Sequence, residues 1–282
     1  MVLDFAAGGE LFTHLVKKGK FNVDESTFYI AELTIALGYL HSKGIIYRDL
    51  KLENVLLDRE GHVLLTDFGL SHKFSDTVGV RKTFSKCGTP EYEAPEIVKS
   101  KGHDFLADWW AVGVLTYELL TAFSPFAWDN PPERVIHERV RHANYPPLDE
   151  TFPIRVRKFV DNLLVKDPEE RLGFNGVEEV KSHQLFFLID WNELINRKIK
   201  PPIVPKVTAE DDSGNFDDEF ISTLPSSWNY AGADGPDCGK KFVGFDYAPP
   251  EREFGPSGGL SPVVESPSEL AMLRKKSSAG IS

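Results

Sequence analysis

The chain has 282 residues, 43 of them acidic and 32 basic, and its formal net charge is −11. Because nucleic acids and anionic membrane surfaces would repel such a chain, the charge argues against both as main partners. It suits a protein that handles cationic substrates, although a solvated acidic surface explains the charge equally well. The two cysteines, Cys87 and Cys238, form no disulfide framework, which indicates a reducing compartment. No apolar run reaches the roughly 18 residues of a membrane-spanning helix, and Asp4 follows the start so closely that we expect no signal peptide.

The first part of the chain predicts helices joined by short loops. A short amphipathic helix is expected over 10–18. A second helix is expected after Asp24, which we predict to be its N-cap, and Gly44 lies just past its end. The broad apolar face of this second helix is formed by Phe28, Ala31, Leu33, Ile35, Leu37 and Leu40.

The middle of the chain predicts a hairpin, a long loop and a buried helix. Two apolar runs, 54–57 and 62–65, are separated by Asp-Arg-Glu-Gly and predict the hairpin. Residues 71–89 are rich in Gly, Ser, Thr and Lys, and loops of this length are usually functional or disordered. Residues 108–120 are almost wholly apolar, which predicts a helix buried on all sides. Further amphipathic helices are predicted over 133–141, 155–165 and 177–183.

After the Lys-Pro-Pro sequence at 200–202 the composition changes to Ser, Pro, Gly and Asp, and helical periodicity ends. Residues 206–282 therefore predict an extended tail with a few aromatic anchors. We find no internal repeat. The predicted fold class is mainly α, with one small hairpin, over residues 1–205.

Three short motifs carry the chemistry. Residues 47–54 read Tyr-Arg-Asp-Leu-Lys-Leu-Glu-Asn, residues 67–69 read Asp-Phe-Gly after the hairpin, and residues 94–96 read Ala-Pro-Glu at the end of the long loop. In this order and context they resemble the catalytic loop, the metal-binding turn and the end of the activation segment of protein kinases. The alternative is chance matches in an unrelated helical protein, and all three spacings argue against it.

Phosphoryl transfer depends mostly on positioning and charge neutralisation, and the motif residues suit it. Asp49 is the candidate base for the substrate hydroxyl, and Lys51 can reach the transferring phosphate. Asn54 and Asp67 offer hard oxygen ligands for Mg²⁺, which bridges the phosphates of ATP. Gly69, beside Phe68, permits the backbone turn that aims Asp67. The expected cofactors are ATP and Mg²⁺.

Further sequences resemble the AGC group of serine/threonine kinases. The stretches 3–15 and 215–220 look most like the N-terminal kinase domain of mitogen- and stress-activated kinases, with the ribosomal-protein kinases close behind. The resemblance implies a hinge and kinase C-lobe over 1–205, an AGC C-terminal tail over 206–250 and a disordered tail over 251–282. The other motifs that carry it are Tyr47 in place of His, Cys87–Tyr92, Asp108–Gly113, Lys166–Pro168 and Arg171–Gly173.

By resemblance, Leu3 is the gatekeeper, the backbones of Asp4 and Ala6 form the hinge that binds adenine, and Leu56 packs beneath the ring. Plain core packing explains the apolar positions equally well. The resemblance also pairs Glu96 with Arg171.

The resemblance further makes Asp108 a brace for the catalytic loop. Ser85 occupies the position of the activation-loop phosphosite, where a phosphate could bind Arg48 and order the loop. The alternative is an unmodified serine.

Glu10, Glu53 and Glu118 match acidic positions that receive arginines N-terminal to the acceptor, and Glu10 also borders the nucleotide site. Carboxylates bind guanidinium groups bidentately, so we expect an Arg-x-x-Ser/Thr preference. Each glutamate alone is equally well a solvated surface charge. By family analogy Thr89 contacts Asp49 and the catalytic lysine, which disfavours tyrosine substrates.

The tail sequence 242–247 resembles the AGC hydrophobic motif, in which aromatic side chains dock in a groove of the small lobe. Its residues are Phe242, Phe245 and Tyr247, with Asp246 in place of the usual phosphorylated residue. The alternative is an aromatic patch without a docking site.

The glycine-rich loop, the strand lysine and its helix glutamate partner are not found in the 282 residues. We therefore expect a chain that begins at the hinge and lacks the small lobe. Two hypotheses follow: a kinase by lineage whose activity alone is uncertain, or a non-catalytic protein that binds substrates or an upstream activating kinase. Lys86 and Glu93 stand where the family usually has apolar residues. No decisive targeting signal is found, so the expected compartment is cytoplasm, nucleus or both.

Overall fold

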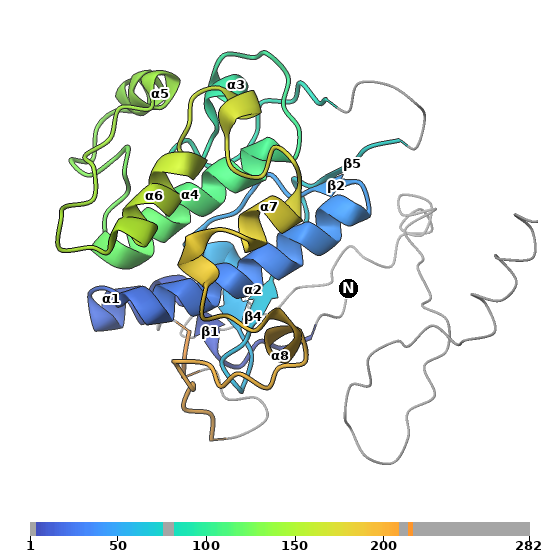
Figure 1. Cartoon of the computed structure of the whole chain (residues 1–282), viewed down its shortest axis with the longest axis vertical. Helices are drawn as coiled ribbons and strands as arrows, with labels where there is room; N and C mark the ends of the chain where they lie inside the picture. The colour runs from blue at the N-terminus through green and yellow to red at the C-terminus, as the bar shows by residue number, and fades with distance from the viewer. Residues whose placement is uncertain (1–3, 76–81, 209–213, 217–282) are drawn as a thin grey trace, which may run out of the picture. The chain divides into compact units, whose positions relative to one another are not determined.

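The structure is a computed structural model that describes residues 4–75, 82–208 and 214–216. All of these belong to the first of two compact units, Met1–Leu224. The fold of this unit is mainly helical with two very small sheets (Figure 1). The predicted fold class is confirmed for the described residues. The tail sequence 242–247 lies outside them.

Two long helices form the centre of the unit. Helix α4 (Leu106–Thr121) is buried at every residue from Leu106 to Leu120, which confirms the predicted buried helix. Helices α2 (Val23–Ser42) and α6 (Ile154–Leu163) both pack against it (Figure 1). Gly113 allows this approach, because a Cβ there would lie 2.9 Å from side-chain atoms of Leu163 and Leu164.

The N-cap predicted for α2 was wrong by two residues. The cap is Asn22, whose side chain accepts a 2.9 Å hydrogen bond from the Glu25 backbone, while the Glu25 carboxylate accepts one from the Asn22 backbone. This reciprocal capping box satisfies two backbone donors at once. Asp24 lies in the first turn, where its charge favours the positive end of the helix dipole.

The predicted hairpin is confirmed as β3 (Val55–Leu57) and β4 (Val63–Leu65), which pair antiparallel. Strand β1 (Gly9–Glu10) adds to β3, giving the order β1-β3-β4. Strand β2 (Ile45–Ile46) pairs with β5 (His72–Lys73). The long loop predicted over 71–89 therefore begins with a short strand, which its polar composition did not indicate.

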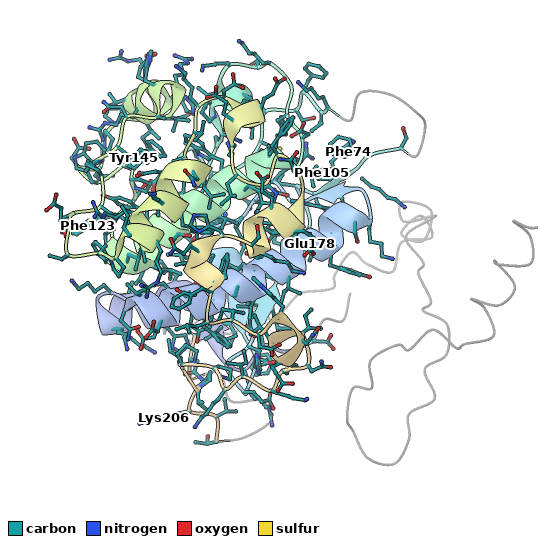
Figure 2. The ribbon with its side chains drawn as sticks, in the orientation of Figure 1. Phe74, Phe105, Phe123, Tyr145, Glu178 and Lys206 are labelled. Carbon is teal, nitrogen blue, oxygen red and sulfur yellow. The ribbon has the colours of Figure 1, made fainter. Side chains whose placement is uncertain are left out.

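An aromatic contact links the end of β5 to the start of α4. Phe74, after β5, meets Phe105, before α4, edge to face with ring centroids 5.2 Å apart (Figure 2). No helix among the described residues is long and apolar enough to cross a membrane. The remaining elements are α1 (Leu11–Lys18), η1 (Leu52–Asn54), α3 (Pro95–Val98), α5 (Glu133–His142), η2 (Pro168–Glu170), α7 (Val177–Lys181), η3 (Gln184–Phe186) and α8 (Trp191–Ile195).

Candidate active site

The backbone of the segment that follows β2 is hydrogen-bonded to a buried carboxylate on α4. Asp108 accepts hydrogen bonds from the backbone N–H groups of Tyr47 (2.9 Å) and Arg48 (2.8 Å). Its Oδ2 also lies 2.8 Å from Nε2 of His41, in the last turn of α2. Arg48 has a φ of 70°, a region that non-glycine residues enter at a cost. The bonds to Asp108 therefore stabilise a strained backbone.

Four polar side chains converge just beyond this strained residue. Asn54 donates to Asp49 Oδ2 (2.9 Å) and to the Asp49 carbonyl (2.8 Å). Lys51 Nζ lies 3.3 Å from the same Oδ2 and 3.4 Å from Thr89 Oγ1. The Thr89 hydroxyl donates to Asp49 Oδ1 at 3.3 Å. The structure thus brings together the predicted base, the predicted lysine and the loop threonine.

The Asp-Phe-Gly turn is tied to this cluster by its neighbours. The Thr66 backbone N–H donates to the Asn54 carbonyl (3.1 Å), and the Tyr47 hydroxyl donates to the Thr66 carbonyl. The φ of Asp67 is 52°, and its carboxylate accepts a 3.0 Å bond from the Gly69 backbone. The pKa of Tyr47 is raised by burial first, and then by carboxylates that include Asp49 and Asp67. Tyr47 and Thr66 therefore connect the Asp-Phe-Gly turn to the segment that carries Asp49 and Asn54.

The donors present fit a magnesium ion. Asn54 uses its N–H group on Asp49, which leaves its carbonyl oxygen available for a cation. Asp67 is exposed, so its carboxylate can take a ligand from solvent. The described residues contain no group of three or more His, Cys, Asp and Glu that could hold a metal. Mg²⁺ needs no such group, because it usually binds one or two protein oxygens together with water and phosphates.

The predicted adenine residues are only partly described. Leu3 lies outside the described residues, Asp4 is exposed and Ala6 is buried. Leu56 is half-buried in β3, where it pairs with Glu10 of β1. Strand pairing thus brings Leu56 beside Glu10, which was also predicted to border the nucleotide site.

The three glutamates predicted to bind arginine differ in environment. Glu10 is half-buried and Glu53 is exposed in η1, whereas Glu118 is buried on α4. The Tyr92 hydroxyl donates to Glu118. Burial raises the pKa of Glu118 to about 8, with the carboxylates of Glu91 and Glu53 adding to the shift and the Tyr92 bond opposing it. A solvated surface charge, the alternative considered for each glutamate, is therefore wrong for Glu118.

The predicted phosphosite, Ser85, is exposed, whereas Thr83, two residues before it, is buried. Arg48 donates from Nε to the Leu70 carbonyl (2.5 Å) and from Nη1 to Thr83 Oγ1 (3.5 Å), two residues before Ser85. The Arg48 guanidinium therefore links the Asp-Phe-Gly segment to the segment that carries Ser85.

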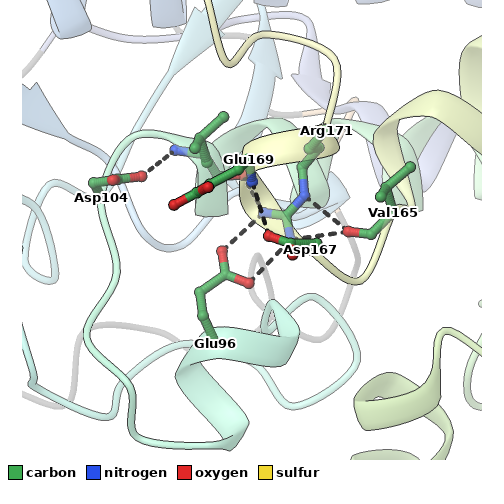
Figure 3. Close-up of polar contacts among 7 residues, drawn as sticks. Glu96, Asp104, Val165, Asp167, Glu169 and Arg171 are labelled. Carbon is green, nitrogen blue, oxygen red and sulfur yellow. Dashed lines mark hydrogen bonds and ion pairs between the residues drawn. The ribbon is translucent and has the colours of Figure 1, made fainter.

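Glu96 and Arg171 form a buried bidentate pair. Arg171 Nη1 and Nη2 donate to the two carboxylate oxygens of Glu96 at 2.8 and 2.9 Å (Figure 3). Arg171 also donates to the backbone carbonyls of Leu106 and Val165. This pair connects the end of the long loop to the segment after α6.

Sequence reasoning missed three residues around the site. His41 supports Asp108 and could have been suspected as a histidine in the last turn of the helix before the motif. Tyr92 was named only as part of a motif and was given no role, although its hydroxyl donates a hydrogen bond to Glu118. His137 of α5, which lies against Glu93, gave no signal in the sequence.

A match to a known protein family agrees with these motifs. Residues 1–186 match the protein kinase domain family. The chain belongs to the protein kinase family.

Its similar relatives are AGC-group kinases, in line with the sequence motifs. The chain is 44% identical over 263 residues to ribosomal protein S6 kinase alpha-4 of Mus musculus, covering 90% of this chain and 33% of that protein. It is 44% identical over 225 residues to the cAMP-dependent protein kinase catalytic subunit PRKX of Homo sapiens, covering 77% of this chain and 59% of that protein. The chain therefore spans between one third and three fifths of the length of these two relatives.

Proposed function

We propose that this protein acts in signal transduction as a serine/threonine kinase, transferring the γ-phosphate of ATP to Ser or Thr of proteins with an arginine three residues before the acceptor. The cluster of Asp49, Lys51, Asn54 and Thr89 supports this proposal most strongly, because it places a carboxylate, a cation and a hydroxyl within 3.5 Å of one another. The similarity to serine/threonine kinases supports it independently.

The residues have distinct tasks in this mechanism. Asn54 and Lys51 hold Oδ2 of Asp49, so that the carboxylate is oriented to accept the proton of a substrate hydroxyl. Lys51 also offsets charge that develops on the transferring phosphoryl group. Asn54 and Asp67 would hold Mg²⁺, which when bound neutralises charge on the ATP phosphates. Phosphorylation of Ser85 by an upstream kinase would add a dianion close to Arg48.

The test is phosphotransfer to an Arg-x-x-Ser peptide by the full chain with ATP and Mg²⁺. We expect Asp49→Asn to lower turnover by at least about 10²-fold, because the carboxylate acts as the base. Asp24→Asn, an exposed aspartate in the first turn of α2, is the matched control and should leave turnover unchanged. Measurable turnover that is equal in Asp49→Asn and the original chain would contradict the assigned role.

The non-catalytic hypothesis has its own signature in the same experiment. A chain that binds the arginine peptide but shows no phosphotransfer at any ATP or Mg²⁺ concentration would be an interaction protein. Asp67→Asn separates the two further. In a kinase it should weaken Mg²⁺-dependent nucleotide binding, measured by titration calorimetry, while peptide binding persists.

A further inference from the structure

Three large apolar side chains lie on the surface where α6 begins and η3 ends. Leu188 is 75% exposed, which is the highest value for a large apolar side chain in the described part of the chain, and Phe187 and Ile154 are 62% and 52% exposed. The guanidinium carbon of Arg155, next to Ile154 in the chain, lies 5.3 Å from the centre of the Phe187 ring. Arg155 therefore joins the three apolar residues into one surface. Single exposed apolar residues are ordinary, but a patch of them with a polar rim marks an interaction site.

The protein core does not need the two most exposed of these residues. Phe186 of η3 is buried and meets Phe159 of α6 edge to face, with ring centroids 5.3 Å apart. Ile189 packs against the core again. Phe187 and Leu188 lie between these two contacts and remain outside. Polar side chains would serve there equally well for folding, so the apolar pair calls for another explanation.

Two cations without partners border the apolar residues. Arg155 and Lys158 are three residues apart on α6, so they are neighbours on the helix surface. Among the described residues neither side chain takes part in an ion pair or a hydrogen bond. Both lie off the face that α6 packs toward α4 (Figure 1), which consists of Val156, Phe159, Val160 and Leu163. The cations are therefore free to take an anionic partner.

The start of α6 adds to this positive charge. A helix N-terminus carries a partial positive charge that acidic side chains usually offset, as Asp24 and Glu25 do in α2. The first turn of α6 has no acidic residue and no side-chain cap, and it contains Arg155. A further cation, Arg157, follows in the next turn and donates only to the backbone carbonyl of Phe152. This corner is thus positive in a chain whose net charge is −11, and an anion would stabilise it.

We propose that Ile154, Arg155, Lys158, Phe187 and Leu188, here called the α6 patch, form a docking surface for an acidic segment of a partner protein. A large apolar side chain of that segment would pack on Phe187 and Leu188 and remove them from water. Aspartate or glutamate side chains beside it would accept hydrogen bonds from Arg155 and Lys158.

The charges favour a protein segment over other anions. A nucleic acid or an anionic membrane would be repelled by a chain with a net charge of −11. Lipid recognition also usually takes clusters of about four to eight basic residues, whereas the α6 patch has two. A short acidic segment brings few charges, and its apolar side chain uses the exposed Phe187 and Leu188.

Stacking of Arg155 on Phe187 does not by itself explain the surface. A guanidinium group can cover an aromatic ring and keep it soluble. Phe187 nevertheless keeps 62% of its surface exposed, and no cation covers Leu188 within the described residues. The stacked pair is therefore an incomplete cover that leaves room for a second side chain.

The test uses the full chain and a display library of random peptides of about 12 residues. Peptides that bind the original chain but not the double variant Arg155→Glu/Lys158→Glu are sequenced. We expect them to carry Asp or Glu beside Phe, Leu, Ile or Trp. In fluorescence anisotropy, a labelled peptide of this set should bind the original chain at least about tenfold more tightly than it binds this variant or Phe187→Ser/Leu188→Ser. Added salt should weaken the binding, because exposed charges are screened.

The matched controls change other exposed residues in the same way. Lys17→Glu/Lys101→Glu alters the net charge equally at two exposed lysines elsewhere. Phe123→Ser removes an aromatic ring that is 61% exposed and lies in the loop after α4 (Figure 2). Both controls should keep the dissociation constant within about twofold of the original. Circular dichroism checks that all variants are folded.

Several results would overturn the inference. These are a library that yields no peptide dependent on the two cations, dependent peptides without acidic residues, and equal losses in the controls. Without peptide binding, attachment to phosphatidylserine vesicles that the Glu double variant abolishes would assign the α6 patch to a lipid surface. A dimer in sedimentation that the same variant disperses would assign it to a second copy of the chain. The proposed kinase function is tested separately, because none of the five residues belongs to the candidate active site.

Discussion

Glu93 and Glu96 lie three residues apart, and each is only 5% exposed, but their surroundings are opposite. Both oxygens of Glu96 accept bonds from Arg171, which is fully buried and also bonded to two backbone carbonyls. Glu93 faces His137 without an aligned bond. Equal burial thus accompanies two aligned bonds in one case and an oxygen, Oε2, without an aligned bond in the other. The difference lies in the partner and not in the burial, because a guanidinium group is aligned with both oxygens of Glu96, whereas the imidazole of His137 is not aligned with Glu93 Oε2.

Glu118 adds a third environment to this comparison. It is buried like the other two, but its partner is the Tyr92 hydroxyl rather than a cation. Its pKa of about 8 means that it holds a proton through most of the neutral range. An arriving arginine would stabilise its charged form, so binding would release a proton. Glu118 is thus an uncharged acid that a cationic ligand would ionise.

The largest effect should come from breaking the satisfied pair. We expect Glu96→Gln and Arg171→Met each to lower the free energy of unfolding by about 3–5 kcal/mol, because each leaves a buried charge unpaired. The double variant should lose much less than the sum, since neither charge remains. Urea unfolding of all four proteins measures the coupling between the two residues. Additive losses would show that the pair is not the unit that stabilises this end of the long loop.

Replacing the unsatisfied carboxylate should have the opposite sign. We expect Glu93→Leu to raise the free energy of unfolding by about 1–3 kcal/mol, because it removes a buried carboxylate that lacks a hydrogen bond. Urea unfolding measures the change. Glu133→Leu, at an exposed position on α5, should stay within about 0.5 kcal/mol of the original. A loss of stability in Glu93→Leu would mean that His137 and Lys86 already satisfy the carboxylate.

Local pattern predicted much of this fold. The buried helix α4 and the β3–β4 hairpin were evident because their apolar periodicity is continuous along the chain. The cap of α2 was misplaced because Asn22 and Asp24 are both good N-cap residues, and only the reciprocal bond with Glu25 distinguishes them. Strand β5 was missed because two residues carry no period and depend on a distant partner.

In the candidate site, too, contacts were predictable only between residues that lie close together in the sequence. Asp49, Lys51 and Asn54 lie in one short motif, so their proximity follows from sequence spacing. Glu93 and His137 belong to segments far apart in the chain, and no local pattern joins them. The sequence flagged Glu93 only as a charged residue where an apolar one is usual. The partner became visible only when α5 was placed beside the loop.

The third stability effect is the pH dependence that Glu118 contributes. Its folded pKa of about 8 lies above the ordinary value of 4.5, so the folded protein holds a proton that the unfolded chain releases. Stability from this group is complete below pH 4.5 and falls as the pH rises toward 8, by at most about 1.4 kcal/mol per pH unit. Glu118→Gln keeps an oxygen acceptor for Tyr92 but cannot ionise, so its advantage over the original chain should grow steadily in urea unfolding at pH 5.5, 6.5 and 7.5. Glu60→Gln removes an exposed carboxylate from the β3–β4 turn, and its stability should run parallel to that of the original chain. If the stability of Glu118→Gln shows the same pH dependence as that of the original chain, then Glu118 is already charged in the folded protein. Glu96 and Glu118 would then both be charged carboxylates with adequate partners, and Glu93 would be the one without.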